Sequence, residues 1–312
     1  MQKRVALIND LSGHGKCSIT SQLPIVAAFG DVASCCITSY LSNHTGYKNK
    51  YKIDLNNHLP KVLDMWKENG FKFDGILTGY IGNKESILDV REYIADLKLE
   101  NENMLVMVDP VCADNGQYYC EMTSEHIENY KKLMEIADVI TPNITEACFL
   151  TGIDYEELRI KCGLLNYDGS EKEKLEHISK KVIEALNDLL KKIIVKRNQI
   201  SLITGIELYN GVVTVLDVYD GDKGIRQTTC NFVNKLESRS GTGDLFDVLF
   251  FEAVLFGYKF VDCLNIASGF VNNALRFTID KKYPKEDGVV YEPILVDNIN
   301  VIRNSTKKEK IK

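Results

Sequence analysis

Gly241-Thr242-Gly243-Asp244-Leu245-Phe246 is the stretch around which the rest of this 312-residue chain is organised. It leads into an apolar segment that ends at Gly257 and in which Asp247 and Glu252 are the only polar residues. The pattern predicts a helix that is buried almost all round, with two glycines and a carboxylate at its N-terminus. Backbone N–H groups at such a terminus attract anions, so the glycines could hold a phosphate while Asp244 removes a proton. A simple helix cap explains the same residues, and the stretch alone favours the cap.

Composition indicates an ordinary globular enzyme. The formal charge is 38 − 44 = −6, which argues against nucleic-acid binding. No apolar run is long enough to cross a bilayer, and the first apolar run begins at Val5, too early for a signal peptide. Nine cysteines without a Cys-x-x-Cys pair and five histidines without paired spacing indicate reduced thiols and no zinc site. We therefore expect a cytoplasmic protein that binds small molecules and neither nucleic acid nor membrane.

Short apolar strands alternate with helices along most of the chain. The predicted strands cover residues 4–9, 32–40, 74–78, 104–108, 137–141 and 200–203, and the predicted helices cover 18–30, 59–70, 87–97, 123–135, 143–150, 171–192, 245–256 and 261–277. Such strands predict an α/β fold with a mainly parallel sheet covered on both faces. Ser18 is expected to cap the first helix, and residues 212–232 to form a hairpin. We expect one domain over residues 1–300, followed by a frayed polar tail at 301–312.

Polar motifs follow several of these strands, where open α/β sheets keep their functional groups. They are Ser42-Asn43-His44-Thr45-Gly46-Tyr47, Thr78-Gly79-Tyr80, Asp109-Pro110-Val111 with Asp114, Thr141-Pro142-Asn143-Ile144-Thr145-Glu146, and Thr204-Gly205. Gly15-Lys16 is not a nucleotide P-loop, because the preceding glycine is wrongly spaced and Cys17 stands where Ser or Thr is required. Taken singly, each motif is explained equally well by a turn or a helix cap.

Taken in order together with Gly241–Phe246, these motifs resemble the pyridoxal/pyridoxamine kinases of the ribokinase-like superfamily, over about residues 4–280. The resemblance implies a three-layer fold with a central, mostly parallel sheet and helices on both faces. It also implies transfer of a phosphoryl group from ATP to the 5′-hydroxymethyl group of pyridoxal, pyridoxamine or pyridoxine. ATP as co-substrate, Mg²⁺ and a homodimer belong to the same expectation, and a monovalent cation such as K⁺ is left open.

The resemblance further implies the site residues. Asp244 matches the general base, and Gly241, Thr242 and Gly243 match the anion hole, which are the groups that phosphoryl transfer needs. The positions that match the vitamin pocket are Asp10, Ser12, Thr45, Tyr80 and Asp244. The positions that match the nucleotide side are Asp109, Asp114, Thr141, Asn143, Thr204, Gly205 and Gly243. Glu146 and Asp109 match the metal side, a sparse set that suits Mg²⁺ because this ion keeps several waters.

Two residues depart from the family pattern. Asp10 stands where many relatives have a serine beside the pyridine ring, and we expect it to accept a hydrogen bond from a protonated ring nitrogen. Asp247 stands where relatives usually carry a small residue, three positions after Asp244. It could repel phosphate, raise the pKa of Asp244, or pair with a cation, and the sequence leaves these alternatives open.

Two other functions are compatible with the sequence. The first is a kinase for another small alcohol, such as a hydroxymethylpyrimidine or a sugar, and the motif Ser42–Tyr47 argues against it. The second is a non-catalytic vitamin-binding protein on the same scaffold. The intact stretch Gly241–Asp244 argues against the second, because a binding protein has no need of a base.

Overall fold

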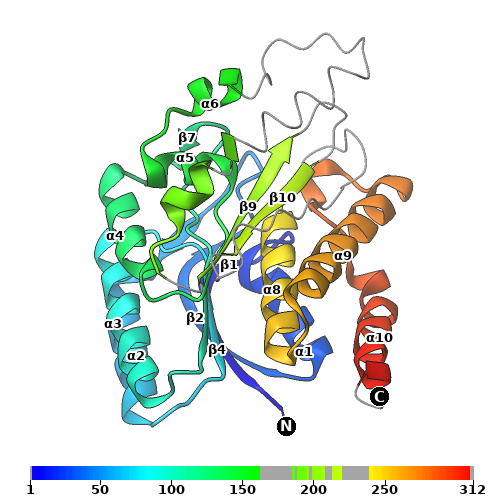
Figure 1. Cartoon of the computed structure of the whole chain (residues 1–312), viewed down its shortest axis with the longest axis horizontal. Helices are drawn as coiled ribbons and strands as arrows, with labels where there is room; N and C mark the ends of the chain where they lie inside the picture. The colour runs from blue at the N-terminus through cyan, green and yellow to red at the C-terminus, as the bar shows by residue number, and fades with distance from the viewer. Residues whose placement is uncertain are drawn as a thin grey trace. The chain divides into compact units, whose positions relative to one another are not determined.

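The computed structural model describes residues 2–161, 185–186, 188–196, 199–207, 213–219 and 239–309. Two compact units divide the chain: Met1–Met107 together with Leu236–Lys312, and Val108–Lys235. The second unit is thus inserted, along the sequence, between the two segments of the first (Figure 1). A single domain over residues 1–300 stays a prediction, and the two units are described one at a time.

The strands of the first unit follow the spatial order β5-β4-β1-β2-β3. Their bounds are Arg4–Ser12 for β1, Val32–Leu41 for β2, Lys52–Asp54 for β3, Gly75–Thr78 for β4 and Leu105–Val108 for β5. β1 pairs in parallel with β2 and β4, and β3 lies antiparallel to β2. Val5, Ala6, Leu7 and Ile8 of β1 are fully buried, as expected for a central strand covered on both faces. The polar residues that follow Ile8 are therefore held at the carboxyl end of a rigid strand.

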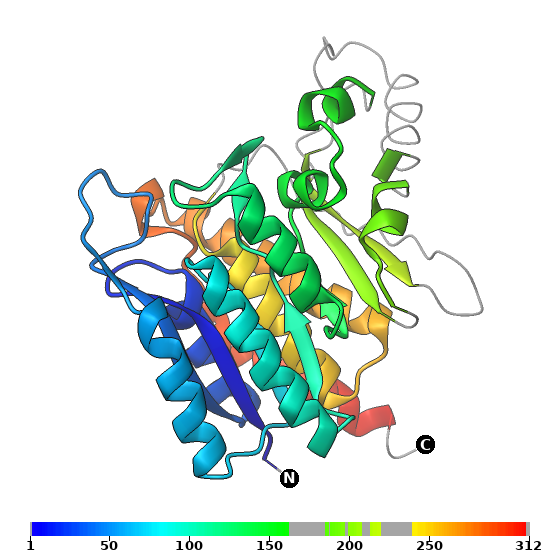
Figure 2. The ribbon, with the colours of Figure 1, turned by 90° about the vertical axis from the view of Figure 1, so that its left-hand side faces the viewer.

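Helices cover both faces of these strands (Figures 1 and 2). One face carries α2 Leu59–Glu68 and α3 Lys84–Glu100, and the other carries α1 Ser18–Phe29 and α8 Thr242–Phe256, against which α9 Phe260–Asp280 and α10 Glu292–Glu309 pack. α8 approaches β4 so closely that a Cβ on Gly75 would lie 2.7 Å from Cζ of Phe251. This packing buries Leu245–Ala253 of α8, so the predicted all-round apolar helix is confirmed.

The second unit is built on β8 Val139–Ile140, β9 Ile200–Glu207 and β10 Val213–Tyr219. β9 is parallel to β8 and antiparallel to β10. Its helices include α4 Ser124–Met134, α5 Ile144–Thr151 and α6 Tyr155–Lys161, and a small hairpin joins β6 Ala113–Asp114 to β7 Gln117–Tyr118. The Thr123 side chain and that of His126 form a capping box at the start of α4. Local capping thus fixes where these helices begin.

The predicted α/β class with mostly parallel strand pairing is confirmed, and each of the six predicted strands is present, with ends that differ from the prediction by at most four residues. Strand β3, the hairpin β6–β7 and helix α10 were not predicted. α10 occupies most of the range expected to be a polar tail, since it runs to Glu309. Residues 171–184 of a predicted helix and 220–232 of a predicted hairpin lie outside the described residues.

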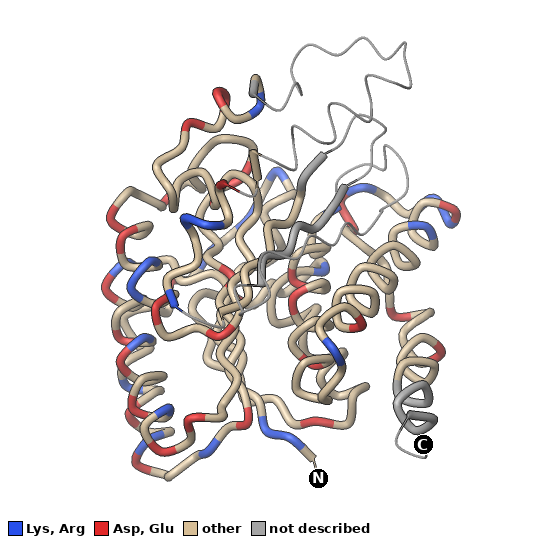
Figure 3. The backbone as a smooth tube through the Cα atoms, viewed as in Figure 1, with Lys and Arg blue, Asp and Glu red and all other residues tan. Residues whose placement is uncertain are grey.

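Acidic and basic residues are interspersed along α2 and α3 (Figure 3). Lys67 of α2 and Asp96 of α3 form an ion pair of 2.5 Å between the two helices. A stripe of basic residues is typical of nucleic-acid binding, and these two helices do not carry one. Across the part of the chain that the structure describes, no helix has the length and apolar character required to span a bilayer.

Candidate active site

The N-terminus of α8 is formed by a glycine that no other residue could replace without distortion. Gly241 has φ 86°, a left-handed backbone that favours glycine. A Cβ on Gly241 would also lie 1.7 Å from the carbonyl oxygen of Lys16, which is far inside van der Waals contact. The loop before α1 and the start of α8 therefore meet backbone to backbone. This close approach is what places Asp244, in the first turn of α8, beside the end of β1.

Asp244 is a half-buried carboxylate that receives hydrogen bonds from outside its own helix. Nδ2 of Asn9 donates to its Oδ1 at 3.4 Å, and the backbone N–H of Ser18 donates to the same carboxylate. Burial raises the pKa of Asp244, and these two donors act in the opposite direction. Because Ser18 is the first residue of α1, the positive ends of two helix dipoles face this carboxylate. The proton affinity of Asp244 therefore exceeds that of an ordinary aspartate, and its role as a base stays a prediction.

Asn9 is a site residue that the sequence analysis missed. It is 1% exposed, and its Oδ1 accepts from the backbone N–H of Asp10 at 2.9 Å and of Tyr80 at 2.8 Å. A Cβ on Gly79 would lie 2.3 Å from Nδ2 of Asn9, so the glycine makes room for the amide. Asn9 links the loop after β4 to Asp244. The available signal was a polar side chain at the end of a continuously apolar strand.

Asp10 lies in the same cluster and is 8% exposed. Its Oδ1 accepts from the hydroxyl of Ser18 at 2.5 Å. The expectation that Ser18 caps α1 is wrong, because the N-cap position is Cys17, without a side-chain cap, and the Ser18 hydroxyl bonds to Asp10 instead. Burial raises the pKa of Asp10 to about 6; the Ser18 bond lowers it and the charge of Asp244 raises it. The other predicted contact, Ser12, is 1% exposed and accepts from Sγ of Cys17 at 3.1 Å.

The loop predicted to bind the vitamin is fixed by its own histidine. His44 is 2% exposed; its Nδ1 accepts from the N–H of Gly46 at 3.1 Å, and its Nε2 lies 2.6 Å from the carbonyl oxygen of Glu286. This pattern assigns the proton to Nε2. The two contacts show that His44 supports the loop. Thr45, between His44 and Gly46, is exposed. Lys52 donates to the hydroxyl of Tyr80 at 3.0 Å.

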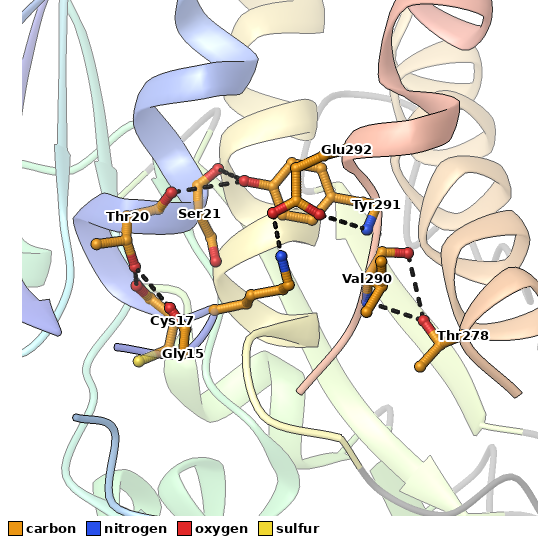
Figure 4. A network of polar contacts seen from close by, with 9 residues as sticks. Gly15, Cys17, Thr20, Ser21, Thr278, Val290, Tyr291 and Glu292 are labelled. Carbon is orange, nitrogen blue, oxygen red and sulfur yellow. Dashed lines mark hydrogen bonds and ion pairs between the residues drawn. The ribbon is translucent and has the colours of Figure 1, made fainter. Parts of the chain in front are cut away.

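A C-terminal segment, residues 288–292, ties α10 to the loop that precedes α1 (Figure 4). Lys16 and Glu292 form an ion pair, and the hydroxyl of Tyr291 donates to the carbonyl oxygen of Ser21 at 3.2 Å. The N–H of Val289 donates to the carbonyl oxygen of Ser240 at 3.1 Å. Because Ser240 precedes Gly241, this segment holds both loops that meet at the start of α8.

The second unit collects the residues predicted for the nucleotide and the metal. Asn143 accepts from the N–H groups of Thr145 and Glu146 at 2.8 and 3.0 Å. The Glu146 carboxylate in turn accepts from the N–H of Asn143 at 2.8 Å and of Cys112 at 3.0 Å. This is a reciprocal capping box that also ties the chain after β5 to α5. Nδ2 of Asn143 also donates to the carbonyl oxygen of Ala113 at 2.8 Å. A nucleotide role for Asn143 stays a prediction.

Four further predicted nucleotide contacts lie in the same unit. Thr141 is 2% exposed, and its hydroxyl has no hydrogen-bond partner within the described residues, which marks a polar atom available to a ligand. The N–H of Thr204 donates to the carbonyl oxygen of Pro142 at 3.0 Å. Gly205 is exposed with φ 70°. Asp114 is also exposed, and its carboxylate accepts from the N–H of Asn115 at 2.8 Å.

Asp109 and Glu146 fit a divalent cation by their charges. Burial raises the pKa of Glu146, and the charge of Asp109 raises it further, so ionising both carboxylates together is unfavourable without a cation. The Glu146 carboxylate already accepts from the N–H groups of Asn143, Cys112 and Ala113, and a carboxylate has about four acceptor sites, which leaves room for a water. Among the described residues no group of three or more His, Cys, Asp or Glu side chains has metal-site geometry. A site for Mg²⁺ here would therefore depend on waters and on phosphate oxygens.

Known proteins resemble this chain in sequence and in fold. A family model described as phosphomethylpyrimidine kinase matches residues 17–164. Pyridoxal kinase from Ovis aries is 34% identical over 116 residues, which make up 36% of this chain and 37% of the sheep protein. The chain spans less than half the length of the curated relatives it matches, from 25% to 49%.

Solved structures match over nearly the whole chain. A Bacteroides thetaiotaomicron protein assigned as a phosphomethylpyrimidine kinase, in a crystal form with pyridoxal, has a TM-score of 0.78 and 28% identity over 96% of each chain. Pyridoxal kinase from Lactobacillus plantarum has a TM-score of 0.76 and 24% identity, over 97% of this chain and 99% of that one. The chain is thus similar to pyridoxal kinases and to phosphomethylpyrimidine kinases in sequence over part of its length, and it shares their ribokinase-like fold.

Proposed function

We propose that the chain is a kinase that transfers the γ-phosphoryl group of ATP to the 5′-hydroxymethyl group of pyridoxal, pyridoxamine or pyridoxine. The observation that carries the proposal is the environment of Asp244. The N-cap residue of α8, Gly241, has no side chain. The Asp244 carboxylate accepts from Asn9, from the N–H of Ser18 and from its own N–H, and burial raises its pKa. These are the properties of a base.

The acceptor half of the reaction is assigned to the first unit. Asp244 accepts the proton of the hydroxymethyl group while the oxygen of that group attacks the γ-phosphorus. The bond from the γ-phosphorus to the β–γ bridging oxygen breaks, and ADP and the vitamin 5′-phosphate are the products. The N–H groups at Gly241–Gly243 stabilise charge on the transferred group. Asp10 accepts a hydrogen bond from the ring, with Ser12, Thr45 and Tyr80 as the other predicted vitamin contacts.

The donor half of the reaction is assigned to the second unit. The residues proposed to contact the nucleotide are Asp109, Asp114, Thr141, Asn143, Thr204 and Gly205. Asp109 and Glu146 would hold Mg²⁺, which when bound neutralises phosphate charge. We assign Asp109 to the ion and Glu146 to its waters, because the Glu146 carboxylate also closes the capping box. Assembly as a homodimer is part of the proposal and is measured by light scattering.

Asp244→Asn is the substitution that tests the base. We expect ATP-dependent formation of pyridoxal phosphate to fall by at least about 100-fold, because general-base catalysis contributes about 10²–10⁴-fold. Binding of pyridoxal, followed by its absorbance, should change far less. The matched control is Asp262→Asn, since Asp262 also lies in the first turn of a helix, α9, but not after a glycine loop. Turnover by Asp244→Asn at the wild-type rate would exclude Asp244 as the base.

A substrate panel separates the proposed function from its alternatives. The family model is described by phosphomethylpyrimidine chemistry, so hydroxymethylpyrimidine is compared with pyridoxal, pyridoxamine and ribose. We expect the highest kcat/KM for a B6 vitamer. A higher kcat/KM for hydroxymethylpyrimidine or ribose would assign the chain to that alcohol instead. Tight binding of pyridoxal with no product in the presence of ATP and Mg²⁺ would indicate a binding protein.

A further inference from the structure

Ser18 joins the two carboxylates of the acceptor half through two different groups. Its hydroxyl donates to Oδ1 of Asp10 at 2.5 Å, and its backbone N–H donates to Asp244. The residue is 7% exposed, and it pairs with Leu11 through an isolated antiparallel bridge. Its backbone is thus tied to the end of β1, the strand that carries Asp10. Both carboxylates are held by one residue whose place is set by the main chain.

The backbone of Ser18 adopts a conformation that disfavours a side chain. Its φ is 52°, and the left-handed region is unfavourable for a residue that has a side chain. A glycine would take the same conformation without that cost. What a glycine would lack is the hydroxyl that reaches Asp10. The strained position is therefore consistent with a use for the serine side chain.

We propose that Ser18 is a positioning residue that keeps Asp10 ionised beside Asp244, so that the vitamin-binding carboxylate and the base are charged over the same pH range. The inference rests on the proposed function, because it takes the acceptor to be a molecule that Asp10 binds through its negative charge. Ser18 itself touches no reacting atom in this scheme. It acts through the two carboxylates.

Several groups around Asp10 affect its ionisation, and some of them oppose the effect of the Ser18 hydroxyl. Burial opposes the charge of Asp10, and the charge of Asp244 does so too; the Ser18 hydroxyl and Lys52 of β3 favour it. Cys17 and Tyr291 also feel these carboxylates, but burial raises the pKa of Cys17 to about 12 and raises that of Tyr291 as well. Both stay neutral near neutral pH. The Ser18 hydroxyl and Lys52 are therefore the side chains that keep Asp10 ionised there.

Two substitutions separate this role from a purely structural one. Ser18→Ala removes the hydroxyl and keeps the strained backbone, whereas Ser18→Gly removes both the hydroxyl and the strain. The N–H that donates to Asp244 stays in both. We measure kcat and KM for pyridoxal with saturating ATP and Mg²⁺, from about pH 5.5 to about pH 9, the range across which a raised carboxyl pKa acts.

Both variants should show the same shift. The pH below which the KM for pyridoxal rises should move up by about one unit, since a charge-assisted hydrogen bond to the ionised form is lost. At the alkaline end kcat should stay within about twofold of wild type, because Asp10 and Asp244 are then ionised in every variant. Ser18→Gly should unfold at a temperature no lower than Ser18→Ala. A wild-type KM profile in Ser18→Gly would show that only the backbone matters and would overturn the proposal.

A readout without turnover keeps the two proposals apart. With ¹³C-labelled aspartate, the carboxyl signal of Asp10 is assigned by its loss in Asp10→Asn and titrated in the wild type and in both Ser18 variants. We expect its midpoint to move to higher pH when the hydroxyl is removed. If the wild-type protein makes no pyridoxal phosphate, the proposed function fails while this titration still tests Ser18. An unchanged Asp10 midpoint would overturn the role of Ser18 even in an active kinase.

Discussion

Asp10 is a buried carboxyl whose ionised form is disfavoured by its surroundings. It is 8% exposed, the charge of Asp244 lies nearby, and its pKa is raised to about 6. A structural carboxylate in such a place would be expected to have a strong cationic partner, whereas the Asp10 carboxylate accepts from the Ser18 hydroxyl and from its own N–H, and the charge of Lys52 has a smaller effect. The environment of Asp10 therefore suits a carboxylate that is completed by a ligand. A protonated pyridine nitrogen is a donor of the required charge.

We expect the affinity for pyridoxal to fall as the pH drops through about 6. The sign follows from the raised pKa: above it Asp10 is ionised and attracts the ring, and below it Asp10 is protonated and the charge is lost. Asp10→Asn should raise the dissociation constant about 10-fold or more at pH 7.5, because hydrogen bonds to charged groups contribute about 1.5–3 kcal/mol. It should also remove the acid limb of the binding curve. Titration calorimetry measures both, and an affinity for pyridoxal unchanged in Asp10→Asn would refute the ring contact.

At the scale of elements, the sequence predicted what periodicity and local chemistry determine. The strands through Val5–Ile8 and Val106–Val108 are continuous apolar runs bounded by polar residues, so they could be located without knowing their partners. Strand β3 is three residues long and partly exposed, and its pairing with β2 comes from tertiary structure. The supporting roles of Asn9 and Ser18 could not be predicted for the same reason. Their partner Asp244 lies more than 200 positions away in the sequence, and no local pattern encodes that contact.

The turn between β8 and α5 allows a cap to be distinguished from a nucleotide contact. Asn143→Asp keeps a good N-cap residue but loses the hydrogen bond from Nδ2 to the carbonyl oxygen of Ala113, so we expect the thermal midpoint to fall by about 2–4 °C. Asn143→Ala should lose about 1 kcal/mol of stability with the cap. If Asn143 also binds the nucleotide, the added negative charge of Asn143→Asp should raise the KM for ATP several-fold while the KM for pyridoxal stays unchanged. A KM for ATP equal to that of wild type would reduce Asn143 to a cap.

At the scale of the whole molecule, one buried acid connects stability to pH. Glu252 of α8 is fully buried, and its carboxyl forms a hydrogen bond with the side chain of Asp31. Burial raises its pKa to about 9, and the charge of Asp31 contributes in the same direction. Glu252 is therefore protonated in the folded protein at neutral pH and ionised once the chain unfolds. Burial of Glu252 therefore lowers the stability of the first unit, in which α8 covers β4 and α1.

Because folded Glu252 binds a proton that the unfolded chain releases, stability should fall as the pH rises between the two pKa values. The ordinary pKa is 4.5 and the pKa in the folded protein is about 9. Between these two values Glu252 lowers the free energy of unfolding by about 1.4 kcal/mol for each pH unit. Glu252→Gln should abolish that contribution. We expect the thermal midpoint of Glu252→Gln, relative to that of wild type, to rise by about 2 °C for each pH unit from 5 to 8.

The matched control is Glu68→Gln, which replaces an exposed carboxylate at the end of α2 in the same unit. The difference between its thermal midpoint and that of wild type should stay constant with pH. A Glu252→Gln difference that is equally constant would mean that Glu252 is already ionised in the folded protein at neutral pH.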